Sequence, residues 1–174
     1  MQLTPMPRRT FLRPAAAGLL AALWPWRASA LEAPAGKVIL TVSGNVANGN
    51  DNGNASFDLA MLQKLPQHSF STRTPWYPQP RKFSGVLLRD LLVAVGATGG
   101  TLKAVALNDY RVDIPAEDVA RYGPMVACLL DDAPMAVRDK GPLVVIYPFD
   151  DKPELRTAVH YSRAIWQLRA IEVK

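Results

Sequence analysis

The chain has 174 residues, a length that suits one domain, because domains typically hold about 100–200 residues. Hydrophobic residues make up 49% and charged residues 20%, with no periodic Gly or Pro, which excludes disordered and collagen-like chains. The net charge of +5 comes mainly from residues 1–30, and the remainder carries 16 Lys and Arg against 15 Asp and Glu. That near balance lacks the basic excess of a nucleic-acid partner, so none is expected.

Residues 1–30 are typical of an export signal, with a basic stretch, an apolar run and the small residues Ala28-Ser29-Ala30 before a cleavage site. The basic stretch Arg8-Arg9-Thr10-Phe11-Leu12-Arg13 resembles the twin-arginine signal, whose passengers cross the membrane already folded and often with a cofactor. We expect a periplasmic protein that begins at Leu31, with residues 31–174 as its single domain.

The alternative for the same segment is a membrane anchor. A span needs about 20 apolar residues, and Pro25 and Arg27 interrupt this run well before that length. The sequence therefore favours a cleaved leader and no membrane span after cleavage.

The first half of the mature sequence alternates between short strands and helices. In chain order it predicts a strand over 37–46, a Gly/Asn loop, a short helix capped by Ser56 and stopped by Pro66, and a strand over 68–74. Pro75, Pro78 and Pro80 then predict an irregular loop that ends at Lys82.

The second half begins with the clearest helix, from Ser84 to a C-terminal Gly96. Two hairpins follow, one turning at Asn108-Asp109 and one at Asp131-Asp132, with a short helix after Pro115 between them. Strands over 143–147 and 165–173 complete an α+β fold, a strand-rich mixed sheet or barrel-like domain with two or three short helices.

Several sequence segments of the mature chain resemble those of one protein family. They are Phe83-Ser84-Gly85-Val86-Leu87-Leu88-Arg89-Asp90-Leu91-Leu92, Leu107-Asn108-Asp109-Tyr110, Gly141-Pro142-Leu143 with Tyr147-Pro148, and Ile165-Trp166-Gln167-Leu168. Together they resemble the molybdopterin-binding oxidoreductase domain of sulfite oxidases, which periplasmic methionine sulfoxide reductases share. The resemblance implies a mixed α+β fold and a molybdenum-molybdopterin cofactor, held by the pterin dithiolene and by one cysteine thiolate.

The chain departs from this family at the cysteine. The matching loop corresponds to residues 70–76 and contains none, while the lone Cys128 stands in an apolar run and is expected to be buried, with metal ligation as the alternative. The resemblance therefore indicates an exported oxidoreductase-like domain with impaired or absent catalysis. The alternative is a non-catalytic ligand-binding, sensory or partner-binding module on the same fold, acting on a small anionic ligand or a periplasmic protein.

The candidate binding residues are Arg73, Trp76, Tyr77 and Arg81, beside Lys82, in the proline-rich segment. Cations among stiffly held aromatic rings suit a planar anionic ligand, and the alternative is a solvated basic loop with Trp76 in the core. The resemblance adds Arg163, because it stands where a basic residue of the family approaches the cofactor. Arg156 is a second candidate for the same role. Each of these two arginines has a surface charge as its alternative reading.

Other chemistry-bearing residues give weaker signals. His68 and His160 are too few for a metal site of ordinary spacing. The adjacent acids Asp131-Asp132 and Asp150-Asp151 are interpreted as turn formers rather than a catalytic pair.

Overall fold

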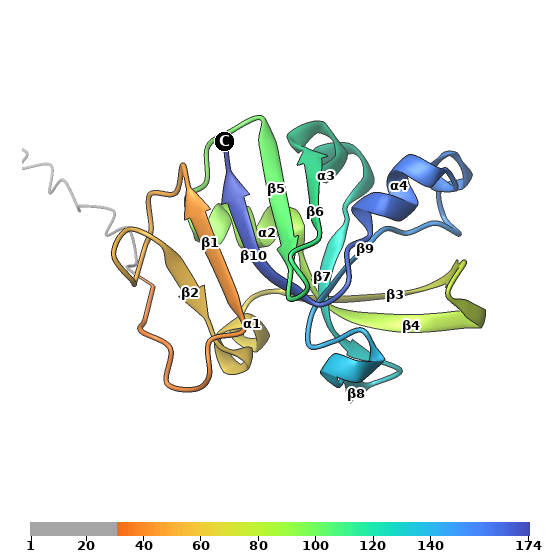
Figure 1. Cartoon of the computed structure of the whole chain (residues 1–174), viewed down its shortest axis with the longest axis horizontal. Helices are drawn as coiled ribbons and strands as arrows, with labels where there is room; N and C mark the ends of the chain where they lie inside the picture. The colour runs from red at the N-terminus through yellow and green to blue at the C-terminus, as the bar shows by residue number, and fades with distance from the viewer. Residues whose placement is uncertain (1–30) are drawn as a thin grey trace, which may run out of the picture.

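The computed structural model describes residues 31–174 (Figure 1). The expected export signal, its cleavage site and the alternative anchor fall in residues 1–30, outside the described residues. Across residues 31–174, no helix is long and apolar enough to cross a bilayer.

Two sheets form the framework. The first, on the left in Figure 1, is mixed, because β1 pairs in parallel with β10 while its other pairings are antiparallel. Its strands, in spatial order, are β2 (Ala55–Phe57), β1 (Leu40–Gly44), β10 (Leu168–Val173), β5 (Thr101–Ala106) and β6 (Arg111–Pro115).

The second sheet is antiparallel and carries the β3–β4 ribbon that projects to the right in Figure 1. Its strands, in spatial order, are β3 (Gln67–Thr74), β4 (Tyr77–Leu87), β7 (Met125–Leu130) and β8 (Ala133–Pro134), with β9 (Val144–Ile146) paired to β7.

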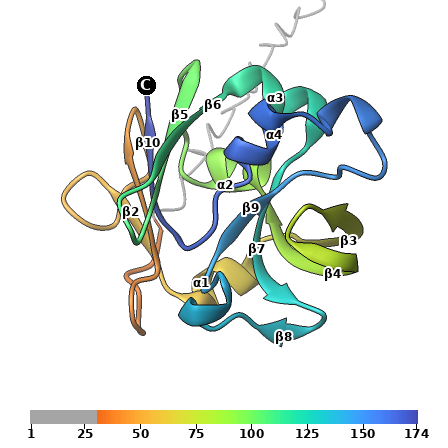
Figure 2. The same ribbon diagram turned by 45° about the vertical axis from the view of Figure 1, so that its right-hand side comes forward.

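Four short α-helices connect these strands in the described part of the chain. They are α1 (Leu59–Lys64), α2 (Leu88–Ala94), α3 (Ala116–Tyr122) and α4 (Ala158–Arg163), and two 3-10 turns cover Val137–Asp139 and Pro153–Leu155. Helices α3 and α4 lie side by side in both views (Figures 1 and 2).

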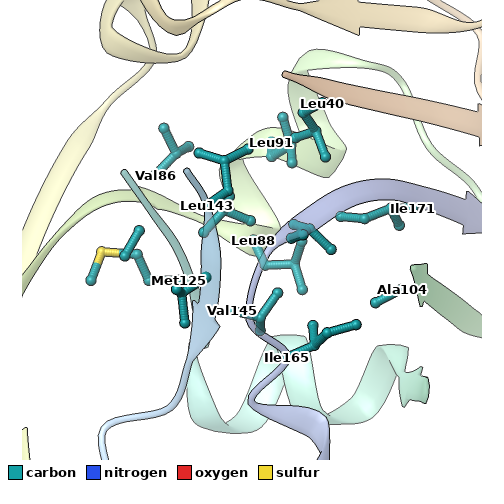
Figure 3. Close-up of a cluster of buried hydrophobic side chains, with 14 of the residues drawn as sticks. Leu40, Val86, Leu88, Leu91, Ala104, Met125, Leu143, Val145, Ile165 and Ile171 are labelled. Atoms are coloured by element: carbon teal, nitrogen blue, oxygen red, sulfur yellow. The ribbon is translucent and has the colours of Figure 1, made fainter. Parts of the chain in front are cut away.

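The core lies between the two sheets and α2 (Figure 3). Leu40 and Ile171 enter it from the first sheet, Val86 and Met125 from the second, and Leu91 from α2, each with at most 1% of its surface exposed. Each Å² of apolar surface removed from water stabilises the fold by about 25 cal/mol. This cluster is therefore the main favourable contribution to folding.

The strand-rich α+β prediction is confirmed, and the sheet is mixed as expected. The two sheets do not close into a barrel within residues 31–174. Both predicted hairpins form, and Asp109, Asp131 and Asp132 have positive φ as their turns require. Helix α4 is present in the structure but is not among the two or three helices that the sequence predicts.

Two predicted helix starts are wrong. Ser56 belongs to β2, where it pairs with Thr41, and the carboxylate of Asp58 instead caps α1 by accepting from the Met61 N–H at 2.8 Å. Residues 84–87 continue β4 along β7, so α2 begins at Leu88. In both places pairing with a distant strand outweighs local helical periodicity.

The predicted irregular loop up to Lys82 is also wrong, because β4 begins at Tyr77 and contains Pro78 and Pro80. Strand β7 pairs with β4 only from Phe83 to Leu87. The prolines therefore stand where β4 has β3 alone as a neighbour, and a strand with an open edge tolerates residues that lack an N–H group.

Gly85 permits the close crossing of β4 and β7, and this gives a test of the fold. A Cβ there would collide with the backbone oxygen of Val126, whereas a Cβ at Gly100 would meet nothing within 4 Å. We expect Gly85→Ala to lower the free energy of unfolding by about 1–3 kcal/mol, as overpacking does, and Gly100→Ala to leave it within about 0.5 kcal/mol. Urea unfolding measures both, and equal midpoints for the two variants would contradict the described crossing.

Candidate functional site

A groove of about 480 Å³ opens where the β3–β4 turn, the end of α4 and the segment before β9 meet. Its aromatic walls are Trp76, Tyr161 and Trp166, and Arg138 and Lys140 add positive charge to its lining. We call this the tryptophan groove. No acidic side chain lines it among residues 31–174.

The aromatic walls hold one another edge to face. The Trp76 ring stands at 87° to that of Trp166, with 4.5 Å between centroids, and at 79° to that of Tyr161, with 6.1 Å. Perpendicular pairs of this kind are a favoured aromatic arrangement. All three rings pack against the core on one side, so the groove is lined by side chains of fixed position and half-buried surface.

Lys140 supplies the available charge. Its ammonium lies 4.6 Å from the centre of the Trp166 ring and 5.0 Å from that of Tyr77, and it forms no ion pair with any residue of 31–174. Cation–π contacts place a cation without neutralising it. The half-buried ammonium therefore remains open to an anion in the groove.

A second hollow of about 390 Å³ adjoins the groove and shares Arg138 and Lys140 with it. Tyr77 lines this hollow, and its ring contacts the Arg81 guanidinium as well as Lys140. Burial raises the pKa of the Tyr77 hydroxyl, and the Arg81 charge partly opposes that shift. The hydroxyl is thus a neutral hydrogen-bond donor or acceptor at neutral pH.

The structure brings together part of the predicted site. Trp76 lines the groove and Tyr77 and Arg81 the adjoining hollow. Arg73 and Arg163 line neither, because each is turned to a carboxylate: Arg73 contacts Asp150 at 3.4 Å and Arg163 contacts Asp118 at 2.8 Å. Arg73 is exposed, as the alternative of a solvated basic segment requires. Trp76 is half-buried and packs against the margin of the core.

The other cations predicted from the sequence also form ion pairs with carboxylates. Arg81 and Lys82 pair with Asp131 and Asp132 in the β7–β8 turn, and Lys82 also donates its backbone N–H to Asp131. That backbone hydrogen bond, with the Arg81 charge, lowers the pKa of Asp131. The interpretation of Asp131-Asp132 as turn formers is confirmed.

The remaining candidates serve packing and local order. Arg156 donates to the backbone oxygen of Phe149 and to Asp150. His68 lies 3.2 Å from Asp90, and His160 packs edge-on against Tyr122, so the two histidines stand in separate surroundings. Within residues 31–174, no group of three His, Cys, Asp or Glu side chains is arranged to hold a metal ion.

The residues present do not fit the thiolate ligand that a molybdenum centre of the sulfite oxidase type implies. Cys128 is buried in β7, 3% exposed, with its sulfur 3.7 Å from the Ser84 carbonyl oxygen. The matching segment of β3 offers only hydroxyls, of which Thr72 accepts from the Asp150 N–H at 3.1 Å. A hydroxyl supplies neither the charge nor the softness of a thiolate.

The sequence interpretation missed Lys140, Tyr161 and Trp166 as parts of one site. Lys140 precedes Gly141-Pro142 and has a φ of 76°, so the local pattern reads only as a turn. Trp166 lies in the last sequence segment that resembles the family, where the alternation of residues predicts a strand. Only the tertiary fold shows that these residues face Trp76.

The site as a whole is a groove with aromatic walls and one lysine that forms no ion pair within residues 31–174. Neither the scan against protein-family models nor the search of curated proteins finds a match for this chain.

Cys128 gives a test of the buried-thiol assignment. Burial raises the pKa of its thiol, so little reactive thiolate is present at pH 8 in the folded protein. We expect iodoacetamide to alkylate Cys128 at least about tenfold more slowly in the native protein than in urea. Equal rates in the two conditions would show that the sulfur is accessible.

Thr74 gives a second test, because its buried hydroxyl has no hydrogen-bond partner in the described structure. Thr74→Val removes an unsatisfied polar atom and should raise the free energy of unfolding by about 1 kcal/mol. Thr72→Val is the matched control, since it deletes the acceptor of the Asp150 N–H and should lower stability by about 1 kcal/mol or more. A destabilised Thr74→Val would mean that the hydroxyl has a partner in solution.

Proposed function

We propose that residues 31–174 form a non-catalytic ligand-binding module, which holds a planar anionic ligand in the tryptophan groove. The single observation that carries the proposal is Lys140, a half-buried ammonium fixed by two aromatic rings and paired with no carboxylate of the described chain. A buried or half-buried cation without a counter-ion is costly, and an anionic ligand would compensate it.

The walls of the groove favour a flat ligand. Trp76 and Trp166 form a corner of two perpendicular rings, against which a planar ring can stack on one wall and meet the edge of the other. Asn108, Ser162 and Gln167 line the same groove and offer polar side chains for the edges of such a ring. A pterin is the ligand class that the resemblance to sulfite oxidases implies, and its size and polarity suit this lining.

The proposed module uses the sulfite oxidase type of fold without its oxygen-transfer chemistry. That chemistry depends on a metal held in fixed geometry by its ligands, and this chain lacks the cysteine at the matching loop. Residues 31–174 would then bind the ligand without oxidising sulfite or reducing sulfoxides.

The resemblance of residues 8–13 to a twin-arginine signal supports a periplasmic location for the module. In that compartment the ligand-bound module would bind a redox or sensory protein, which is the partner class of the non-catalytic alternative.

A matched pair of ligands tests the proposal. Pterin-6-carboxylate carries the anionic group and unsubstituted pterin has the same ring system without it. Trp76 and Trp166 are the only tryptophans of residues 31–174 and both line the groove, so quenching of tryptophan emission reports binding there. We expect pterin-6-carboxylate to bind more tightly than pterin.

Lys140→Gln should weaken pterin-6-carboxylate about tenfold, the value of one charge-assisted hydrogen bond of about 1.4 kcal/mol, and leave pterin unchanged. Lys37→Gln, an exposed lysine ahead of β1, is the control and should change neither affinity. Equal losses for both ligands, or binding unaffected by Lys140→Gln, would refute the assigned role of this lysine. Inorganic phosphate as a competitor shows whether the charge alone suffices for binding.

A further inference from the structure

The groove depends on helix α4, whose attachment to the body of the protein is unusual. The helix has only six residues, and none of them is fully buried. Yet Tyr161 and Ser162 on this helix, and Ala164 and Ile165 just after it, all line the tryptophan groove. A helix with so little buried surface needs another interaction to keep its position.

The strongest such interaction is a partly buried charge pair between α4 and α3, beside a hydrogen bond from the Tyr110 hydroxyl to the Ser162 backbone oxygen at 3.2 Å. The Arg163 guanidinium donates to the Asp118 carboxylate at 2.8 Å, and the side chains are 21% and 9% exposed. The same carboxylate oxygen accepts from the Tyr147 hydroxyl at 3.0 Å, and the Tyr147 side chain is fully buried. Asp118 is thus held from the core side by Tyr147 and itself holds α4 through Arg163.

The neighbouring contacts show that Arg163 is the ionic tether of α4. His160 on the same helix lies 4.0 Å from Asp118, beyond hydrogen-bond distance, and its ring rests on Tyr122 and Tyr147. Thr157 caps the start of the helix from within its own segment. Among residues 31–174, the Arg163–Asp118 pair is therefore the shorter of the two charged contacts that join α4 to α3, the other being His160–Asp118 at 4.0 Å.

We propose that Asp118 and Arg163 are positioning residues for the tryptophan groove: their ion pair fixes α4 so that the Tyr161 ring stands against Trp76. The inference rests on the proposed ligand-binding function for its effect on affinity, but its structural part applies to the ligand-free protein. Arg163, which the resemblance marked as a cofactor contact, acts here through Tyr161 rather than on the ligand.

Tyr147 provides a control inside the same cluster. Tyr147→Phe removes a hydrogen bond from Asp118 but keeps the aromatic ring and the Asp118–Arg163 pair, so α4 keeps its tether. Arg163→Gln removes the tether itself. Both variants should unfold at lower urea concentrations than the wild type, because each leaves Asp118 with one partner fewer.

The ligand-free test uses the two indole N–H signals in a ¹H–¹⁵N spectrum. Arg163→Gln should shift the Trp76 signal, because the Tyr161 ring 6.1 Å away moves, while Tyr147→Phe should leave it at its wild-type position. Asp118→Asn, close in shape to the native residue, should reproduce the Arg163→Gln shift and serves if Arg163→Gln does not fold. An unmoved Trp76 signal in the Asp118 and Arg163 variants, or an equal shift in Tyr147→Phe, would overturn the proposal.

Measurements of ligand affinity distinguish a positioning role of the ion pair from a general effect on protein stability. Pterin-6-carboxylate should bind about tenfold more weakly to Arg163→Gln and Asp118→Asn, and with wild-type affinity to Tyr147→Phe. The double variant of Asp118 and Arg163 should lose no more affinity than either single variant, because both remove one pair. Affinity losses that follow the urea midpoints across all variants would overturn the positioning role, whereas a wild type that binds no pterin would refute only the proposed function.

Discussion

The groove is assembled by the hydrogen bonds of one residue, Gln167, which connects three segments that are distant in the sequence. Its backbone N–H donates to the Lys140 oxygen at 3.0 Å, its backbone oxygen accepts from Leu107 at 2.8 Å, and its side-chain amide donates to the Val137 oxygen at 2.8 Å. Its φ of 53° turns the chain immediately after Trp166 and into β10. These bonds fix the Lys140 segment relative to Trp166, and the neighbouring bonds from Leu168 to Leu143 and from Val145 to Ile165 continue the same connection.

Charge pairing decides which cations remain for a ligand. Arg73 and Arg156 share Asp150, Arg81 and Lys82 pair with the β7–β8 turn, and Arg163 pairs with Asp118, so the basic character of the segment near Trp76 is largely balanced within the fold. Lys140 differs because its ammonium contacts aromatic rings and forms no ion pair with a carboxylate of residues 31–174, while the adjacent Asp139 pairs with Arg138. In the proposed function, aromatic walls and one such cation would select first for a flat shape and then for a single negative charge, which suits recognition more than the stabilisation of a reacting centre.

Local sequence signals predicted the strands other than β2 and β4, both hairpins and the buried Cys128, because alternation, turn residues and apolar runs act over a few neighbours. They failed where a distant partner decides the outcome. Residues 84–87 have helical periodicity but pair with β7, and Pro78 and Pro80 look like loop residues but stand on an open strand edge. The candidate site follows the same division. Trp76, Tyr77 and Arg81 were found through their clustering in the sequence, whereas the pairing of Arg163 with Asp118, 45 residues away, and the approach of Lys140 to Trp166 exist only in the folded chain.

We propose that residues 31–174 use a groove for recognition and lack the ligand set for molybdenum-dependent oxygen transfer. The most direct measurement is the molybdenum content per chain of protein produced with molybdenum cofactor supplied, combined with an assay of sulfite oxidation and methionine sulfoxide reduction using an artificial electron mediator. We expect molybdenum far below one atom per chain and no turnover of either substrate. One molybdenum per chain with sustained turnover would contradict it.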